Sequence, residues 1–154
     1  AVQGGAQTYL TLLMGTHGGV LGETCALTIL IGGIYLIATK VISPIIPVTY
    51  LGTVAVLSLV AGKDPIYQLL SGGLMLGAFF MATDYVTSPT TNKGKIVFGL
   101  GLGIVTCAIR FLGTMNEGVS FAILLMNLLV PYIDVLTRQD LLGVAKVKKG
   151  GAAK

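Results

Sequence analysis

The residues best suited to chemistry lie in one short polar stretch that follows a long apolar run. The stretch reads Met81-Ala82-Thr83-Asp84-Tyr85-Val86-Thr87-Ser88-Pro89-Thr90-Thr91-Asn92. Unpaired polar groups are costly at membrane depth, so they are retained where protein, a cofactor or water satisfies them. Such a density of hydroxyls around one carboxylate therefore predicts a site rather than a plain membrane anchor.

Two interpretations of this stretch remain open. In the first, Asp84 and the hydroxyls satisfy the last carbonyls of the preceding helix and cap the next one, each cap being worth about 1 kcal/mol. In the second, the loop lines an ion path or holds the polar ring of a cofactor. It offers many acceptors and hydroxyl donors in a region that is shielded from water.

A second candidate site is the glycine-rich segment Gly18-Gly19-Val20-Leu21-Gly22-Glu23-Thr24. Glu23 can compensate the positive end of the dipole of the helix that follows. Alternatively, glycine backbone lets a planar ligand approach while Glu23 and Thr24 form hydrogen bonds with its polar edge. The two roles are compatible with each other.

Two further charged residues lie beside apolar runs. For Arg110 we favour snorkelling to the outer headgroups, with pairing to Glu117 or to a phosphate as the alternative. Asp134 follows Pro131 and marks either a kinked exit from the membrane, which we favour slightly, or an ionisable group on a conduction path.

No catalytic residue and no metal site are predicted. His17 has no carboxylate or second histidine at ligand spacing. Cys25 and Cys107 lie in apolar runs and are expected to pack as small apolar residues, although a metal or iron–sulfur centre shared with a partner subunit is an alternative. A nucleic-acid partner is not expected, because no basic face carries interleaved aromatic residues.

The composition predicts an all-α integral membrane protein. Of the 154 residues, 54% are hydrophobic and 10% are charged, and the mean hydropathy is +0.89. Soluble domains carry about 25% charged residues. Tryptophan is absent and there are 22 glycines, which favours helices packed through small residues over a barrel with aromatic girdles.

Charged residues divide the chain into five predicted spans, since a helix needs about 17 to 25 residues to cross the hydrocarbon core. The spans are Thr24 to Thr39, Val41 to Gly62, Pro65 to Thr83, Ile96 to Ile109 and Gly118 to Ile133. Asp64 followed by Pro65 predicts the start of the third. The pairs Gly72-Gly73 and Gly101-x-Gly103 are interpreted as helix-packing positions.

The predicted organisation has three parts: a short interfacial or half-membrane helix with a glycine-rich turn (1–23), the five-span domain (24–137) and a basic cytoplasmic tail (138–154). With the first residue outside, every basic residue except Lys63 and Arg110 lies on the cytoplasmic side, in line with the positive-inside tendency. Because the chain starts at Ala1 without a signal-peptide pattern, we expect it to begin within a longer protein.

Four blocks of the chain closely resemble the C-terminal half of the D subunit of Rnf electron-transport complexes, and the related B subunit of sodium-pumping NADH:quinone reductase is similar. These blocks are Gly18 to Thr24, Ile31-Gly32-Gly33-Ile34-Tyr35-Leu36, Phe80 to Pro89, and Asn116 to Asn127. The resemblance extends to about Arg138, and its Ala-Thr-Asp-x-x-Thr-Ser-Pro block is specific.

The resemblance implies two inverted five-span repeats, an arrangement shared with urea transporters, of which this chain would be one half. It also implies FMN, linked covalently through phosphate to a threonine of a Ser-Gly-Ala-Thr motif, and a second flavin, riboflavin. The segment Gly4-Gly5-Ala6-Gln7-Thr8 does not match that motif, so the acceptor is expected upstream. The expected contacts for a flavin or for the coupled ion are Gly22, Glu23, Thr24, Asp84, Thr87, Ser88, Pro89 and Thr90.

The expected function is that of a flavin-carrying membrane subunit of a redox-driven Na⁺ or H⁺ pump that passes electrons between ferredoxin and NAD. Its partners would be other membrane and peripheral subunits in the cytoplasmic membrane of a bacterium or archaeon. One alternative is a channel or transporter for a small polar solute. Another is a scaffold subunit without a cofactor.

Overall fold

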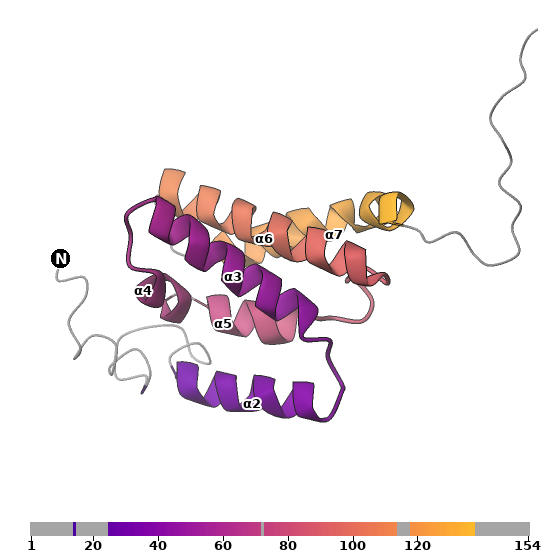
Figure 1. The fold of residues 1–154 in the computed structure, drawn as a ribbon, viewed down its shortest axis with the longest axis horizontal. Coiled ribbons are helices and arrows are strands. Elements are labelled where there is room, and N and C mark those ends of the chain that lie inside the picture. Colours follow the sequence, from indigo (N-terminus) through magenta and orange to yellow (C-terminus); the bar gives the residue numbers. More distant parts are fainter. Residues whose placement is uncertain (1–13, 15–24, 72, 114–117, 138–154) are drawn as a thin grey trace, which may run out of the picture.

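The computed structural model describes residues 14, 25–71, 73–113 and 118–137, and all of its regular elements are helical. In chain order they are α2 (Ala26–Ala38), α3 (Ile45–Val60), α4 (Pro65–Leu70), α5 (Leu74–Leu76), the π-helical turn η1 (Gly77–Met81), α6 (Asn92–Leu112) and α7 (Gly118–Thr137). Figure 1 shows α3, α6 and α7 as the main body, with α4 and α5 beside them and α2 on the outside. The predicted all-α class is confirmed for the described residues.

The most extensive packing is between α3 and α6, which run parallel. Gly99 lies opposite Thr49, and Gly103, one turn further along, lies opposite Thr53. Glycine at these positions lets the two backbones approach closely, as is common between helices in membranes. The seam is completed by Tyr50, whose hydroxyl forms a 2.7 Å hydrogen bond with the Thr106 hydroxyl in the buried core.

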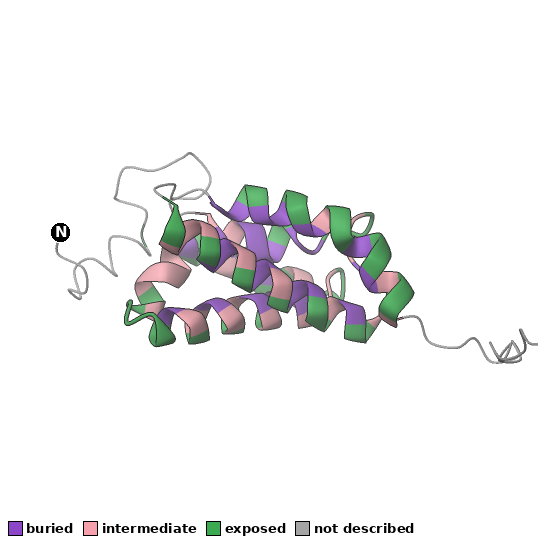
Figure 2. Cartoon of the chain, turned by 90° about the horizontal axis from the view of Figure 1, so that it is seen from above, coloured by how far each residue is buried: buried purple, intermediate pink, exposed green. Residues whose placement is uncertain are grey.

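Helix α7 runs antiparallel to α6. Gly94 at the start of α6 lies against Thr137 at the end of α7, and Gly118 lies against Ile109 at the opposite ends. The buried residues of α7 recur about every three or four positions, singly or as adjacent pairs, and form one stripe: Gly118, Val119, Ala122, Ile123, Met126, Val130 and Ile133. Figure 2 shows such stripes turned toward the bundle, while the outer faces of the helices are exposed.

The structure contains two helices that are long and apolar enough to cross a membrane, α6 and α7, among the described residues. The other two apolar helices are shorter, with 13 residues in α2 and 16 in α3. Helix α2 packs on the α5–η1 segment, where Gly32 and Gly33 lie against the rings of Phe80 and Phe79. The five crossings and the urea-transporter arrangement stay predictions.

The third predicted span, Pro65 to Thr83, is wrong as a continuous helix. Asp64 and Pro65 do start a helix, but α4 ends at Leu70 because Ser71 is extended, with φ −92° and ψ 138°. Gly73 then has φ +59°, a left-handed conformation that glycine adopts without steric cost. Gly73 thus marks a chain break, whereas the sequence analysis assigned it to helix packing.

Candidate functional site

The candidate site begins where the broken third segment ends. The turn η1 closes with a π-type bond from the Ala82 amide to the Gly77 carbonyl, at 2.7 Å. The buried Thr83 hydroxyl donates to the Phe79 carbonyl at 2.6 Å. Single π turns are frequent at functional sites, because they change the direction in which the following residues point. Here the residues that follow are the polar stretch that starts at Asp84.

The polar stretch is organised around Asp84. The Thr87 hydroxyl donates to a carboxylate oxygen of Asp84 at 3.3 Å, and the Ser88 amide donates to its carbonyl at 3.1 Å. Asp84 is exposed, Thr87 and Ser88 are half-buried, and Pro89 is fully buried. The carboxylate therefore keeps acceptor capacity free for a donor or cation from outside this loop.

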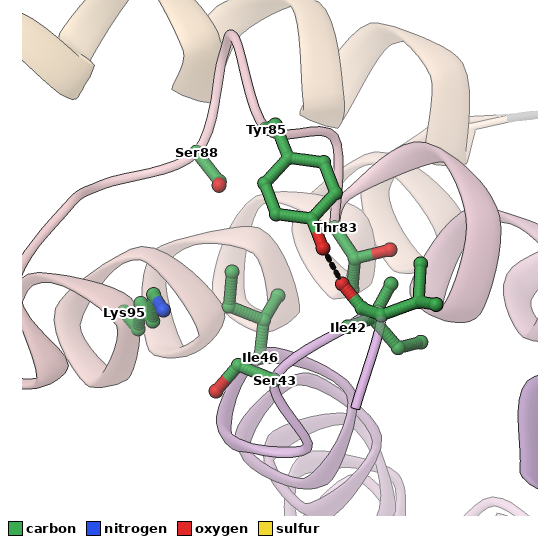
Figure 3. Close-up of a pocket in the computed structure, with 8 residues that line it drawn as sticks. Ile42, Ser43, Ile46, Thr83, Tyr85, Ser88 and Lys95 are labelled. Atoms are coloured by element: carbon green, nitrogen blue, oxygen red, sulfur yellow. Dashed lines mark hydrogen bonds between the residues drawn. The ribbon is translucent and has the colours of Figure 1, made fainter. Parts of the chain in front are cut away.

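A small cavity of about 40 Å³ lies between this loop and the starts of α3 and α6. Its polar lining comes from Ser43, Thr83, Tyr85, Ser88 and Lys95. The Tyr85 hydroxyl donates to the backbone carbonyl of Val41 and so ties the loop to the α2–α3 connection (Figure 3). A cavity of this size has room for ordered water or a small ion.

Thr90 points to a different neighbour. Its amide and its hydroxyl both donate to Oδ1 of Asp134, at 3.2 and 3.4 Å. These residues border a second hollow of about 230 Å³, together with Thr91 and Val135. Helix α7 continues through Pro131 to Thr137, so Asp134 lies within the helix, one turn after its internal proline.

Capping of α6 is performed by Thr91, one of the hydroxyls that the first interpretation of the polar stretch assigned to this role. The Thr91 hydroxyl accepts a 3.0 Å hydrogen bond from the Gly94 amide and forms a 2.7 Å bond with the Thr137 hydroxyl. Asp84 does not cap α6, which leaves its carboxylate available for another role. The remaining predicted contacts, Gly22, Glu23 and Thr24, lie outside the described residues.

The predicted snorkelling of Arg110 to the outer headgroups is wrong. Its Nη1 donates to the Gln68 carbonyl at 2.8 Å, and its Nη2 donates to the Ser71 carbonyl at 2.9 Å. These carbonyls are at the end of α4, where helical partners run out. The sequence held one clue to this contact. A glycine pair inside the third predicted span can break a helix, and a broken helix exposes carbonyls that need donors.

Two buried polar atoms escaped the sequence analysis altogether. Ser58 Oγ and Asn127 Oδ1 have no hydrogen-bond partner among the described residues. Asn127 lies near the middle of α7, where an unsatisfied amide oxygen is costly in lipid. In a membrane span, such atoms are commonly satisfied by water, an ion or an adjoining segment.

The polar loop fits one edge of a flavin or a hydrated cation, and it does not enclose a flavin ring. Asp84, Thr87 and Ser88 supply acceptors and hydroxyl donors at an accessible surface. The neighbouring cavity, at about 40 Å³, is too small for a tricyclic ring. Asp84, Thr87 and Ser88 could therefore contact a flavin along one edge only.

Comparisons with known proteins identify the family of the chain. The model of the NQR2, RnfD, RnfE family matches residues 2–143. The chain belongs to the NQR2, RnfD, RnfE family. It is 48% identical, over 97% of its length, to the D subunit of the Na⁺-translocating ferredoxin:NAD⁺ oxidoreductase complex of Acetobacterium woodii. The D subunit of the corresponding proton-translocating complex of Clostridium ljungdahlii is 45% identical over 84% of the chain.

A third member of the NQR2, RnfD, RnfE family, the D subunit of the ion-translocating oxidoreductase complex of Stutzerimonas stutzeri, is 46% identical over 84% of the chain. The chain spans 48% of the length of the Acetobacterium protein and 41% of the Clostridium protein. The family assignment confirms the resemblance noted in the sequence.

Proposed function

We propose that this chain is part of a flavin-carrying membrane subunit of a redox-driven ion pump that transfers electrons between ferredoxin and NAD⁺. The observation that carries the proposal is 48% identity, over nearly the whole chain, to the D subunit of a Na⁺-translocating ferredoxin:NAD⁺ oxidoreductase complex. The partners would be the other membrane and peripheral subunits of such a complex. The protein would lie in the cytoplasmic membrane, with the start of this chain outside and its end in the cytoplasm.

The coupled ion is either Na⁺ or H⁺. Relatives that are named for each ion have nearly the same identity to this chain, 48% and 45%. Identity therefore does not separate the two. The chemistry of the loop around Asp84 is compatible with both ions, because a carboxylate among hydroxyls can bind a proton or coordinate a hard cation.

In this proposal, Asp84, Thr87, Ser88, Pro89 and Thr90 contact a flavin edge or the coupled ion, together with Gly22, Glu23 and Thr24. FMN would be attached to a threonine upstream of this chain, and riboflavin would be a second flavin. A bound flavin would supply one- or two-electron chemistry, and the protein would tune it through hydrogen bonds and local dielectric. The hydroxyls of Thr87 and Ser88 would orient the polar edge, and Pro89, which is fully buried, would fix the loop.

The test is a visible spectrum of the complete protein, purified from membranes, with mass spectrometry of the intact polypeptide. Flavin absorption, fluorescence and a mass increase equal to FMN are expected. A colourless protein that conducts a small polar solute would refute the proposal in favour of a transporter. A colourless protein without flux would indicate a scaffold role.

Alanine substitutions at Asp84, Thr87 and Ser88 test the site. We expect loss of non-covalent flavin or of ion pumping in at least one of them. Ser120→Ala is the matched control, because Ser120 is an exposed serine on α7. If all three variants keep the flavin content and the ion pumping of the control, the site assignment is wrong. That result would leave the proposal of a flavin-carrying subunit untouched.

A further inference from the structure

Helix α4 is too short to be stable by itself. It has six residues, whereas isolated helices below about 12 residues are marginal. Its last turn is only partly covered by the rest of the bundle, since Gln68 and Ser71 are half-buried. The backbone carbonyls at this end need partners from another element, because the chain turns away at Ser71.

Arg110 supplies those partners from α6. One guanidinium group reaches both the Gln68 carbonyl, at 2.8 Å, and the Ser71 carbonyl, at 2.9 Å. The same Nη1 also lies 3.4 Å from the side-chain oxygen of Gln68. Three oxygens of one helix end thus converge on a single planar cation. Arginine suits this arrangement, because its donors form a rigid fork.

The direction of the side chain favours this contact over the membrane surface. Arg110 lies in the last turn of α6, and side chains on a helix tilt toward its N-terminus. The guanidinium is therefore directed back along α6, toward the interior of the bundle. In that position it also complements the negative end of the dipole of α6.

Carbonyls at the ends of broken helices commonly coordinate Na⁺ or H⁺ in transporters. Here the oxygens of Gln68 and Ser71 accept hydrogen bonds from the guanidinium of Arg110, a cation that belongs to the protein itself. We propose that Arg110 is a positioning residue whose fixed charge locks the end of α4. It thereby occupies permanently a position that is otherwise attractive to a free cation.

A short stretch of chain joins the end of α4 to the candidate site. The segment after Ser71 comprises α5 and η1, and it leads directly into the loop that contains Asp84. The inference itself rests only on the Arg110 contacts, and it stands whether or not the loop binds a flavin.

The test measures how readily the end of α4 opens. Ser71→Cys keeps the backbone carbonyl that Arg110 contacts and adds a thiol at the half-buried chain break. The variant is made in the complete protein within its complex, with Cys25 and Cys107 replaced by alanine. The readout is the rate at which a water-soluble maleimide labels the thiol at position 71.

Three variants separate charge from size. We expect Arg110→Gln to raise the labelling rate at least several-fold, and Arg110→Lys to raise it less, because lysine keeps the charge but loses the fork. Lys63→Gln is the matched control. It removes a neighbouring cation, 4.1 Å from the centroid of the Phe111 ring, without touching the carbonyls of α4. Equal rates for the Lys and Gln variants, or a rise in the control, would overturn the proposal.

Chemical rescue provides the second arm. In Arg110→Ala, millimolar ethylguanidinium should slow the labelling again, whereas urea at the same concentration should not. Urea has a similar planar shape and N–H donors but no charge. If ethylguanidinium has no effect, or if urea protects equally well, then a charged lock at this position is disproved. Retention of flavin by these variants is measured separately and bears only on the proposed function.

Discussion

At the scale of single residues, one polar pair in the buried core joins two helices directly. Tyr50 on α3 is fully buried, and its hydroxyl bonds to the buried hydroxyl of Thr106 on α6. The two residues are 56 positions apart in the sequence. Nothing in the local sequence pairs them, because only the parallel packing of α3 on α6 brings them together.

Removing one member of this pair leaves the other hydroxyl buried without its partner. We expect Tyr50→Phe to lower the free energy of unfolding by about 1 kcal/mol. Thr106→Val should have a similar effect. The double variant should be less damaging than the sum, with a coupling of about 0.6 kcal/mol, as is typical of hydrogen bonds between membrane helices. Thermal unfolding in detergent measures all three variants, and strictly additive effects would mean that the bond contributes nothing.

At the scale of elements, close approach between helices depends on glycines that face threonines. A Cβ atom added at Gly103 would lie 2.5 Å from the Cβ of Thr53 and 2.6 Å from its Cγ2. The pair can relieve this overlap only if α3 and α6 move apart. Since both helices carry core residues along this seam, a shift would disturb the whole bundle.

We therefore expect Gly103→Ala to destabilise the protein by about 1 to 3 kcal/mol, the usual cost of overpacking. Gly52→Ala is the matched control on α3, because a Cβ there meets no atom within 4 Å. It should be neutral or slightly stabilising, since alanine is the better helix former. Adding Thr53→Gly to Gly103→Ala should relieve the clash. If both alanine variants melt at the same temperature, the seam is looser than the structure implies.

The third predicted span shows why a chain break is hard to recognise in the sequence. Length and hydropathy predicted a single span from Pro65 to Thr83, and the start at Asp64-Pro65 was correct. The break was missed because glycine pairs occur both at packed helix surfaces and at chain reversals. Only the left-handed conformation of Gly73 distinguishes the two cases.

At the scale of the whole molecule, the packing fixes the relative directions of three helices. Helices α3 and α6 run parallel and α7 runs antiparallel to them, as the glycine contacts show. The turn that contains Lys63 therefore lies at the same end of the bundle as the end of α6. Lys40, in the α2–α3 connection, and Lys93, in the first turn of α6, lie at the other end, which is the grouping that the charge-based prediction requires.

This topology predicts opposite labelling of cysteines at the two ends. The variants are made in a protein in which Cys25 and Cys107 are replaced by alanine. In intact cells, a membrane-impermeant maleimide should label Lys63→Cys. Lys40→Cys and Lys93→Cys should react only after the membrane is permeabilised. All three lysines are exposed in the structure, so the membrane and not burial should decide their reactivity. Labelling of Lys40→Cys and Lys63→Cys from the same side would contradict an α3 that crosses the bilayer.

The sequence by itself determined the helical class, the start of α4 and the family. Apolar content, proline position and a specific motif are local properties, and local properties can be read along the chain. The tertiary structure alone decided that Arg110 serves the end of α4, that Thr90 binds Asp134 and that Tyr50 meets Thr106. Each of these contacts joins residues about 40 to 56 positions apart. Such contacts depend on how the helices pack, and helix packing is set by the fit of whole surfaces and not by any short stretch of residues.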